Sequence, residues 1–181
     1  METKKDIRKR IFSRRKEASE RELLENSRAV FRRVQGCEQY RKARTVYAYM
    51  DFNREVMTRE FIRQVWADGK QVAVPKVHGK DMTFYVLESF DQLEPGYFGI
   101  DEPVRGKIAD DEQALLIVPG VAFDLQRHRI GYGQGFYDRY LSVHTNHSTI
   151  AVAFEFQVLE HVPSESTDIC PQLLITEQRV L

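Results

Sequence analysis

The segment with the clearest chemical potential covers residues 127–138 and has the sequence RHRIGYGQGFYD. Three glycines alternate with other residues here, so the backbone can approach a ligand closely at three points. Free N–H groups in such a turn, followed by the N-terminus of a helix, create partial positive charge that attracts an anion. The pattern predicts a phosphate-binding turn formed by Gly131, Tyr132, Gly133, Gln134, Gly135, Phe136 and Tyr137.

Two charged residues flank this turn. Arg129 has a planar guanidinium group that suits phosphate oxygens. Asp138 falls in the first turn of a helix expected over residues 136–141, where a carboxylate can hold Mg²⁺ beside phosphate. Alternating glycines also occur in ordinary tight turns, and an acidic residue here often only interacts with the helix dipole. The segment is neither a P-loop nor a dinucleotide fingerprint, but the flanking charges favour phosphate binding.

Composition limits the class of protein. With 181 residues, 42% hydrophobic and 30% charged, the chain is typical of one soluble globular domain, residues 1–181. Zero formal net charge gives no overall attraction to nucleic acid or an anionic membrane, and no apolar run is long enough to span one. Cys37 and Cys170 are too few for a disulfide framework. We therefore expect a cytoplasmic monomer with reduced thiols and neither a nucleic-acid nor a membrane partner.

The sequence begins with two predicted helices. Residues 3–18 form a basic helix in which Ile7 and Ile11 lie four apart on one face. Its other side chains are mostly Lys and Arg, which is usual for a solvated face and is here balanced by acidic residues later in the chain. Ser19, with Glu22 three residues later, begins a second helix that ends at Gly36. Together the two helices predict an N-terminal helical hairpin.

Strands and helices then alternate. Apolar or β-branched runs predict strands over residues 45–50, 71–74, 82–86, 114–118, 149–154 and 173–175. Another helix begins at Thr58 and ends near Gly69, and residues 91–112, rich in glycine and proline, predict a long functional surface loop. This alternation is typical of an α/β fold, here a single-domain sandwich with a largely parallel central sheet flanked by helices.

Residues 117–124 (IVPGVAFD) and 129–138 (RIGYGQGFYD) resemble the signature of the 5-formyltetrahydrofolate cyclo-ligase family. Residues 4–8 are similar to the basic helix that contributes to the family's nucleotide site. Met50 and residues 53–58 are similar to its folate-contacting segment, with Met57 as a departure, and residues 98–103 are similar to the loop beside the pterin. Asp168 and the following residues resemble its C-terminal end, so the resemblance covers nearly the whole chain.

The resemblance implies ATP-dependent closure of 5-formyltetrahydrofolate to 5,10-methenyltetrahydrofolate, with Arg129 as the catalytic residue. The ATP-binding residues it implies are Lys4, Lys5, Arg8, Arg129 and the turn residues Gly131, Tyr132, Gly133, Gln134, Gly135, Phe136 and Tyr137. The implied substrate-binding residues are Met50, Glu55, Phe98, Tyr132, Gly133, Gln134, Gly135 and Phe136. Asp138 and Asp168 would hold Mg²⁺.

Two other classes of function stay open at this point. One is a nucleotide- or folate-binding protein without turnover, although Arg129, Asp138 and Asp168 are all present. The other is an enzyme that acts on sugar phosphates or coenzyme A esters with a similar sheet, since one fold hosts many chemistries. The choice of ligand would decide against this last class: a folate bound together with ATP excludes it, whereas a sugar phosphate or a thioester bound without ATP supports it.

Overall fold

The computed structural model describes residues 2–181 and contains a six-stranded sheet in the order β11-β9-β6-β1-β2-β3. All neighbouring strands are parallel except β2 and β3, which are antiparallel. The predicted, largely parallel sheet is therefore confirmed. Its strands are β1 (Thr45–Tyr47), β2 (Gln71–His78), β3 (Asp81–Leu87), β6 (Leu115–Val118), β9 (Ser148–Val152) and β11 (Leu173–Ile175).

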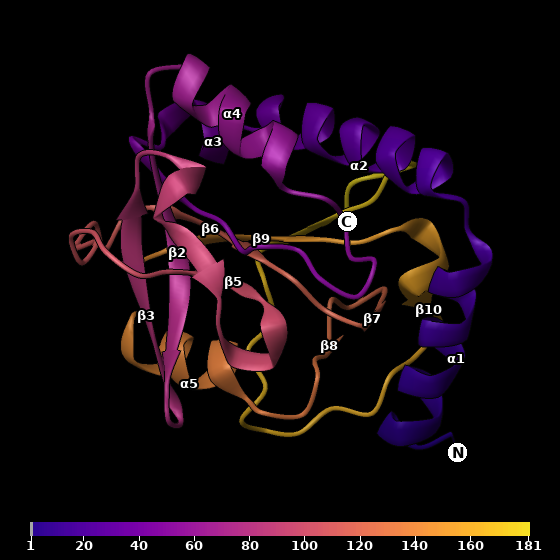
Figure 1. Ribbon diagram of the computed structural model, residues 1–181. Helices are drawn as coiled ribbons and strands as arrows, with labels where there is room; N and C mark the ends of the chain where they lie inside the picture. The colour runs from indigo at the N-terminus through magenta and orange to yellow at the C-terminus, as the bar shows by residue number, and fades with distance from the viewer. Residues whose placement is uncertain (1) are drawn as a thin grey trace.

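Helices cover both faces of this sheet (Figure 1). On one face lie α2 (Glu20–Gln35), α3 (Glu38–Lys42) and α4 (Arg59–Ala67), and on the other lies α5 (Phe136–Val143). The α/β sandwich predicted from the alternation of elements is thus confirmed. Within residues 2–181, no helix combines the length and the apolar character needed to cross a membrane.

The two faces of the sheet bury different side chains because successive residues of a strand point in opposite directions. In β6, Leu115 and Ile117 pack in the core beneath α2 and α4, whereas Leu116 and Val118 pack in the core beneath α5. All four residues are at most 1% exposed. A strand buried on both faces needs a continuous apolar run, and that is the pattern from which it was predicted.

Helix α1 (Lys4–Glu17) lies beside a smaller sheet in the order β10-β7-β8. Its Ile7 and Ile11 pack against a third apolar cluster that includes Val121, Ile130 and Val162. The chain bends at Ala18, which is extended, and α2 continues in a different direction (Figure 1). Because each helix buries its apolar side against a different layer, the expected hairpin is an angled pair of helices. The small strands are β7 (Ala122–Asp124), β8 (Arg129–Ile130) and β10 (Val158–Leu159).

The expected long loop over residues 91–112 contains paired strands. Strands β4 (Leu93–Pro95) and β5 (Asp101–Pro103) form an antiparallel pair whose tip is a short 3₁₀ helix, η2 (Tyr97–Gly99). Two further 3₁₀ helices, η1 (Phe90–Gln92) and η3 (Glu155–Gln157), lie elsewhere in the chain. Strand β2 also continues through Pro75, where we expected it to end, because pairing with β1 stops at Ala73 and leaves the proline opposite β3 alone.

Replacing Thr58 with valine should reduce the free energy of unfolding by about 1–3 kcal/mol. The Thr58 side chain is fully buried, and its Oγ1 donates to the Tyr49 carbonyl over 2.7 Å. Valine has nearly the same shape but leaves this buried carbonyl without its donor. Denaturant unfolding measures the effect, and Thr58→Ser, which keeps the hydroxyl, should be the milder variant. Equal losses for both variants would contradict the hydrogen-bond explanation.

Candidate active site

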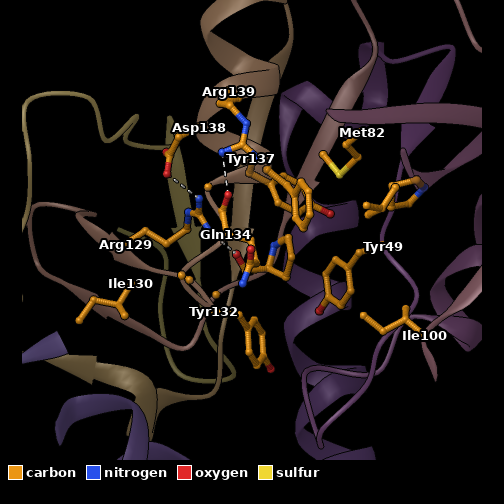
Figure 2. A pocket seen from close by; sticks show the side chains of 18 of the residues that line it. Tyr49, Met82, Ile100, Arg129, Ile130, Tyr132, Gln134, Tyr137, Asp138 and Arg139 are labelled. Atoms are coloured by element: carbon orange, nitrogen blue, oxygen red, sulfur yellow. Dashed lines mark hydrogen bonds and ion pairs between the residues drawn. The ribbon is translucent and has the colours of Figure 1, made fainter. Parts of the chain in front are cut away.

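A cavity of about 730 Å³ opens where β1 and β6 end, and the glycine-rich turn forms part of its wall. Tyr49 and Met50 follow β1, whereas Pro119 and Gly120 follow β6, and all four line the cavity. The carboxyl ends of neighbouring parallel strands are the usual place for a ligand in an α/β fold. In Figure 2, Arg129 and Asp138 lie on one side of the cavity, and Tyr49, Met82 and Ile100 lie on the other. The site therefore has a charged end and an apolar end.

The glycine-rich turn follows β8 and leads directly into α5. Gly133 and Gly135 have φ values of 101° and 70°, a left-handed conformation that side chains with a Cβ atom rarely adopt. Gly135 is the N-cap of α5 and has no side chain to cap the first N–H groups of that helix. These amides consequently keep their hydrogen-bonding capacity for a ligand. Every residue from Gly131 to Asp138 lines the cavity.

Arg129 lies at the charged end with only 8% of its side chain exposed. Its Nη1 donates to the Pro119 carbonyl over 3.2 Å, and its Nη2 is 3.4 Å from Asp138 Oδ2 (Figure 2). Its Nε is buried and has no partner. A buried donor without a partner is rare and often marks the place of a ligand. The guanidinium group is thus held in a fixed orientation, and three of its five N–H donors, including that of Nε, have no described partner.

Helix α1 contributes two cations to the same end. Arg8 Nε donates to the Gly131 carbonyl over 2.7 Å, and Lys4 Nζ is 2.8 Å from Glu165 Oε1. The hydrogen bond to Glu165 raises the pKa of Lys4, so this side chain stays charged at neutral pH. Lys4 and Arg8 are four residues apart and share a helix face, but Lys5 is turned about 100° from Lys4 and does not line the cavity. The structure does not bring Lys5 into the expected site.

Asp138 and Asp168 both line the charged end. Asp138 Oδ1 accepts from the Ile169 N–H over 3.0 Å, and Asp168 Oδ2 accepts from the Glu165 N–H over 2.8 Å. Among residues 2–181 there is no group of three or more His, Cys, Asp or Glu side chains that could hold a metal ion. Mg²⁺ usually takes one or two carboxylates, with phosphate oxygens and water as its other ligands. The donor set fits Mg²⁺ bound together with a nucleotide.

Glu55 lies deep in the cavity wall and is only 3% exposed. Its Oε2 accepts from the Phe52 N–H over 3.1 Å, inside a tight turn in which Asn53 and Arg54 both have positive φ. Burial raises the pKa of Glu55 to about 7, while Arg15 and the Phe52 N–H act in the opposite direction. A carboxyl group with a near-neutral pKa in a cavity is a candidate for ligand recognition.

Aromatic and apolar side chains form the rest of the wall. Met50 is 4% exposed, whereas Phe98, at the tip of the β4–β5 pair, is 77% exposed although it also lines the cavity. Tyr132 packs against Phe12 and Phe52, and burial raises its pKa to about 12. An exposed ring at the rim and buried rings inside suit a flat, partly apolar ligand.

The structure brings all the residues expected from the sequence, other than Lys5, to this one cavity. Several wall residues were not foreseen, and those that follow β1 and β6 could have been found from the strand ends alone. Arg15 was also missed, although it continues the four-residue spacing of Ile7 and Ile11. The unforeseen wall residues include Tyr49, Phe52, Pro75, Val77, Met82, Tyr97, Pro119, Gly120, Arg139, Glu165 and Thr167.

Comparison with known proteins points to one family. A model described as the 5-formyltetrahydrofolate cyclo-ligase family matches residues 1–177. The chain is 30% identical to a probable 5-formyltetrahydrofolate cyclo-ligase of Schizosaccharomyces pombe, with 84% of each chain covered. It is 32% identical to the 5-formyltetrahydrofolate cyclo-ligase of Escherichia coli K12, with 76% of this chain and 80% of the other covered.

A solved structure shows the same fold. The 5,10-methenyltetrahydrofolate synthetase of Aquifex aeolicus superposes with a TM-score of 0.86 at 34% identity, covering 98% of this chain and 91% of that one. Sequence and structure thus agree over almost the full length of the chain.

Proposed function

Because the chain belongs to the 5-formyltetrahydrofolate cyclo-ligase family, we propose that it uses ATP to convert 5-formyltetrahydrofolate into 5,10-methenyltetrahydrofolate, working as one domain over residues 1–181. The observation that supports this most is the single cavity in which the unpartnered Nε of Arg129 and the glycine-rich turn share walls with Glu55 and Met50. One end suits phosphates and the other suits a flat ring, which is what a reaction between ATP and a folate requires.

The reaction needs ATP because the oxygen of a formamide is a poor leaving group. Transfer of the γ-phosphoryl group to the formyl oxygen releases ADP and gives an iminium phosphate. Attack by N10 on the same carbon then closes the ring, N10 loses its proton, and phosphate leaves with the original formyl oxygen. Phosphoryl transfer is catalysed mainly by positioning and charge neutralisation, so a site built from fixed cations and backbone amides is sufficient.

At the nucleotide end, Arg129 is the catalytic cation, and the amides of residues 131–136 bind the phosphates with Lys4 and Arg8. Asp138 and Asp168 would hold Mg²⁺, which when bound supplies further neutralisation of phosphate charge. At the folate end, Glu55 accepts from the amino and ring N–H groups of the pterin. Met50 forms an apolar wall there, and Phe98 stacks on the ring. Tyr132 and Phe136 separate the two substrates.

The decisive test is an absorbance assay for methenyltetrahydrofolate with purified protein, 5-formyltetrahydrofolate, Mg²⁺ and ATP. Product should form with ATP and should be absent when ATP is omitted. If folded protein gives no product, the cyclisation is refuted, and equilibrium binding of ATP and the folate then separates a binding protein from an enzyme for another substrate.

Replacing Phe98 with alanine should raise the KM for 5-formyltetrahydrofolate by about fivefold or more, because a ring stacked on the pterin contributes about 1 kcal/mol beyond its buried area. The KM for ATP and the thermal stability should change little, because Phe98 is 77% exposed. Val143→Ala is a matched control, since Val143 is 75% exposed and does not line the cavity. An unchanged folate KM in Phe98→Ala would remove this residue from the proposed folate site.

A further inference from the structure

Arg15 is buried to an extent that is unusual for a charged side chain. It is 1% exposed and is one of the largest fully buried side chains, although the helix that contains it is otherwise basic and largely solvated. No carboxylate among residues 2–181 lies within 4.0 Å of its guanidinium nitrogens, and its Nε has no partner. Burial of an unpaired charge is costly, so this position requires an explanation beyond packing.

The guanidinium group joins three segments that line the cavity. Its Nη1 donates to the Tyr132 hydroxyl over 2.7 Å and to the Asn53 carbonyl over 3.1 Å, and its Nη2 donates to the Gly120 carbonyl over 3.1 Å. These partners belong to the glycine-rich turn, the turn that precedes Glu55 and the segment after β6. One side chain thereby fixes the wall between the charged and the apolar ends of the cavity.

The turn before Glu55 is also attached to α1 from the opposite direction. Arg54 Nε donates to the Arg15 carbonyl over 2.8 Å, and Arg54 Nη2 donates to the Ala18 carbonyl. Asn53 and Arg54 have φ values of 47° and 59°, which are unfavourable for residues with side chains. The position of Glu55 thus depends on a strained turn that α1 holds in place through both arginines.

Arg15 also sets the electrostatic environment of Glu55. The titratable groups that face this carboxylate are Asp51 from its own segment, Tyr49 after β1, Tyr132 from the glycine-rich turn, Tyr137 from α5 and Arg15 from α1. Among these described residues, Arg15 is the only cation. It therefore opposes the burial and the neighbouring Asp51, both of which favour protonation of Glu55.

We propose that Arg15 is a positioning residue that fixes Tyr132 and the turn before Glu55, and that its charge favours the ionised form of Glu55, which recognises N–H donors on the substrate. The identity of those donors as a pterin rests on the proposed function. The coupling between Arg15 and Glu55 does not, and it is measurable in the free protein.

A direct test follows the ionisation of Glu55 by NMR in protein labelled with ¹³C at glutamate carboxyl groups, with Glu55→Gln identifying the signal. Wild type should titrate with a midpoint near pH 7. In Arg15→Met the midpoint should rise by about one pH unit or more, whereas Arg15→Lys, which keeps the charge, should stay closer to wild type. Folded Arg15→Met with an unchanged midpoint would overturn the proposal, because a purely structural role moves stability and not this titration.

Should Arg15→Met fail to fold, Arg15→Gln decides, because its amide group keeps hydrogen-bond donors but removes the charge. The midpoint of Glu55 should rise in this variant as well. Folded Arg15→Gln with an unchanged midpoint would overturn the coupling.

Binding of 5-formyltetrahydrofolate provides a second readout. Affinity for the folate should fall in wild type as pH drops through about 7, and this fall should occur at higher pH in Arg15→Met. The affinity for ATP should depend on pH in the same way in wild type and in Arg15→Met. If wild type binds no folate, the proposed function fails, whereas the NMR titration still decides the role of Arg15.

Discussion

Arg129→Ala should lower the turnover number for methenyltetrahydrofolate formation by about 10³-fold or more. The guanidinium group is held through Nη1 by the Pro119 carbonyl and through Nη2 by Asp138, and its buried Nε has no partner. Such a fixed cation stabilises the charge that spreads over the transferring phosphoryl group and needs no reorganisation during the reaction. The loss should appear mainly in kcat, because the amides of residues 131–136 remain to bind the nucleotide. Steady-state kinetics with varied ATP measures it.

Arg129→Lys and Arg21→Ala are the informative companions to this variant. Lysine restores a positive charge without the planar pair of donors, so its activity should lie between wild type and alanine. Arg21 is an arginine whose side chain is 85% exposed and pairs only with Glu25, so its loss should leave turnover unchanged. Near-normal turnover in folded Arg129→Ala would show that Arg129 is not the catalytic cation.

Glu55→Gln should raise the KM for 5-formyltetrahydrofolate by about 10–100-fold, since hydrogen bonds to a charged partner contribute roughly 1.5–3 kcal/mol each. The amide keeps one acceptor oxygen, but its NH₂ group faces the N–H donors of the pterin. Kinetics with varied folate measures the change at pH 8, where the wild-type carboxylate is mostly ionised. An unchanged KM at this pH would remove Glu55 from folate recognition.

The same substitution should make the free protein more stable at alkaline pH. The pKa of Glu55 is about 7 in the folded protein against an ordinary value of 4.5, so folding opposes its ionisation. This penalty is absent below the unfolded pKa, grows as the pH rises between the two values and is complete above the folded one. The difference of 2.5 units corresponds to about 3 kcal/mol at most. Glu55→Gln should gain this stability at pH 8 and lose most of the gain at pH 5. A difference in unfolding free energy between wild type and Glu55→Gln that does not change with pH would contradict the expectation.

The main sheet could be predicted because its strands bury regular apolar patterns. The run at β6 and the β-branched residues of β1, β2 and β9 indicate buried strands without knowledge of their neighbours. The two-residue strands β8 and β10 have no such pattern, because they form only where β7 supplies a partner. Likewise, β4 and β5 contain prolines and acidic residues typical of loops, and pairing between them overrides that local preference.

The candidate site was predictable where the local spacing of residues determines which way their side chains or amides point. It was less predictable where the contacts join residues that are distant in sequence. Alternating glycines before a helix indicate an anion site by themselves, and the structure brings Arg129 and Asp138 to it. Which cations of α1 reach that site depends on how the helix is rotated, and this follows from the burial of Ile7 and Ile11. The same rotation turns Lys5 away from the site and Arg15 inward. Arg15 continues the four-residue spacing of Ile7 and Ile11 and Lys5 does not, so this spacing could have predicted that Arg15 is buried and that Lys5 is not.

The ion pair between Lys4 and Glu165 joins residues 161 positions apart, and Lys4 also lies 3.6 Å from Asp168 Oδ2. During synthesis on a ribosome Lys4 emerges long before Glu165 and Asp168 and stays without these partners while the segments between them are made. A nascent polypeptide can form α1, α2 and much of the central sheet while the charged end of the cavity is still open. The proposed ATP site is therefore completed only after Glu165 and Asp168 have emerged, so a chain cut before these residues should not consume nucleotide.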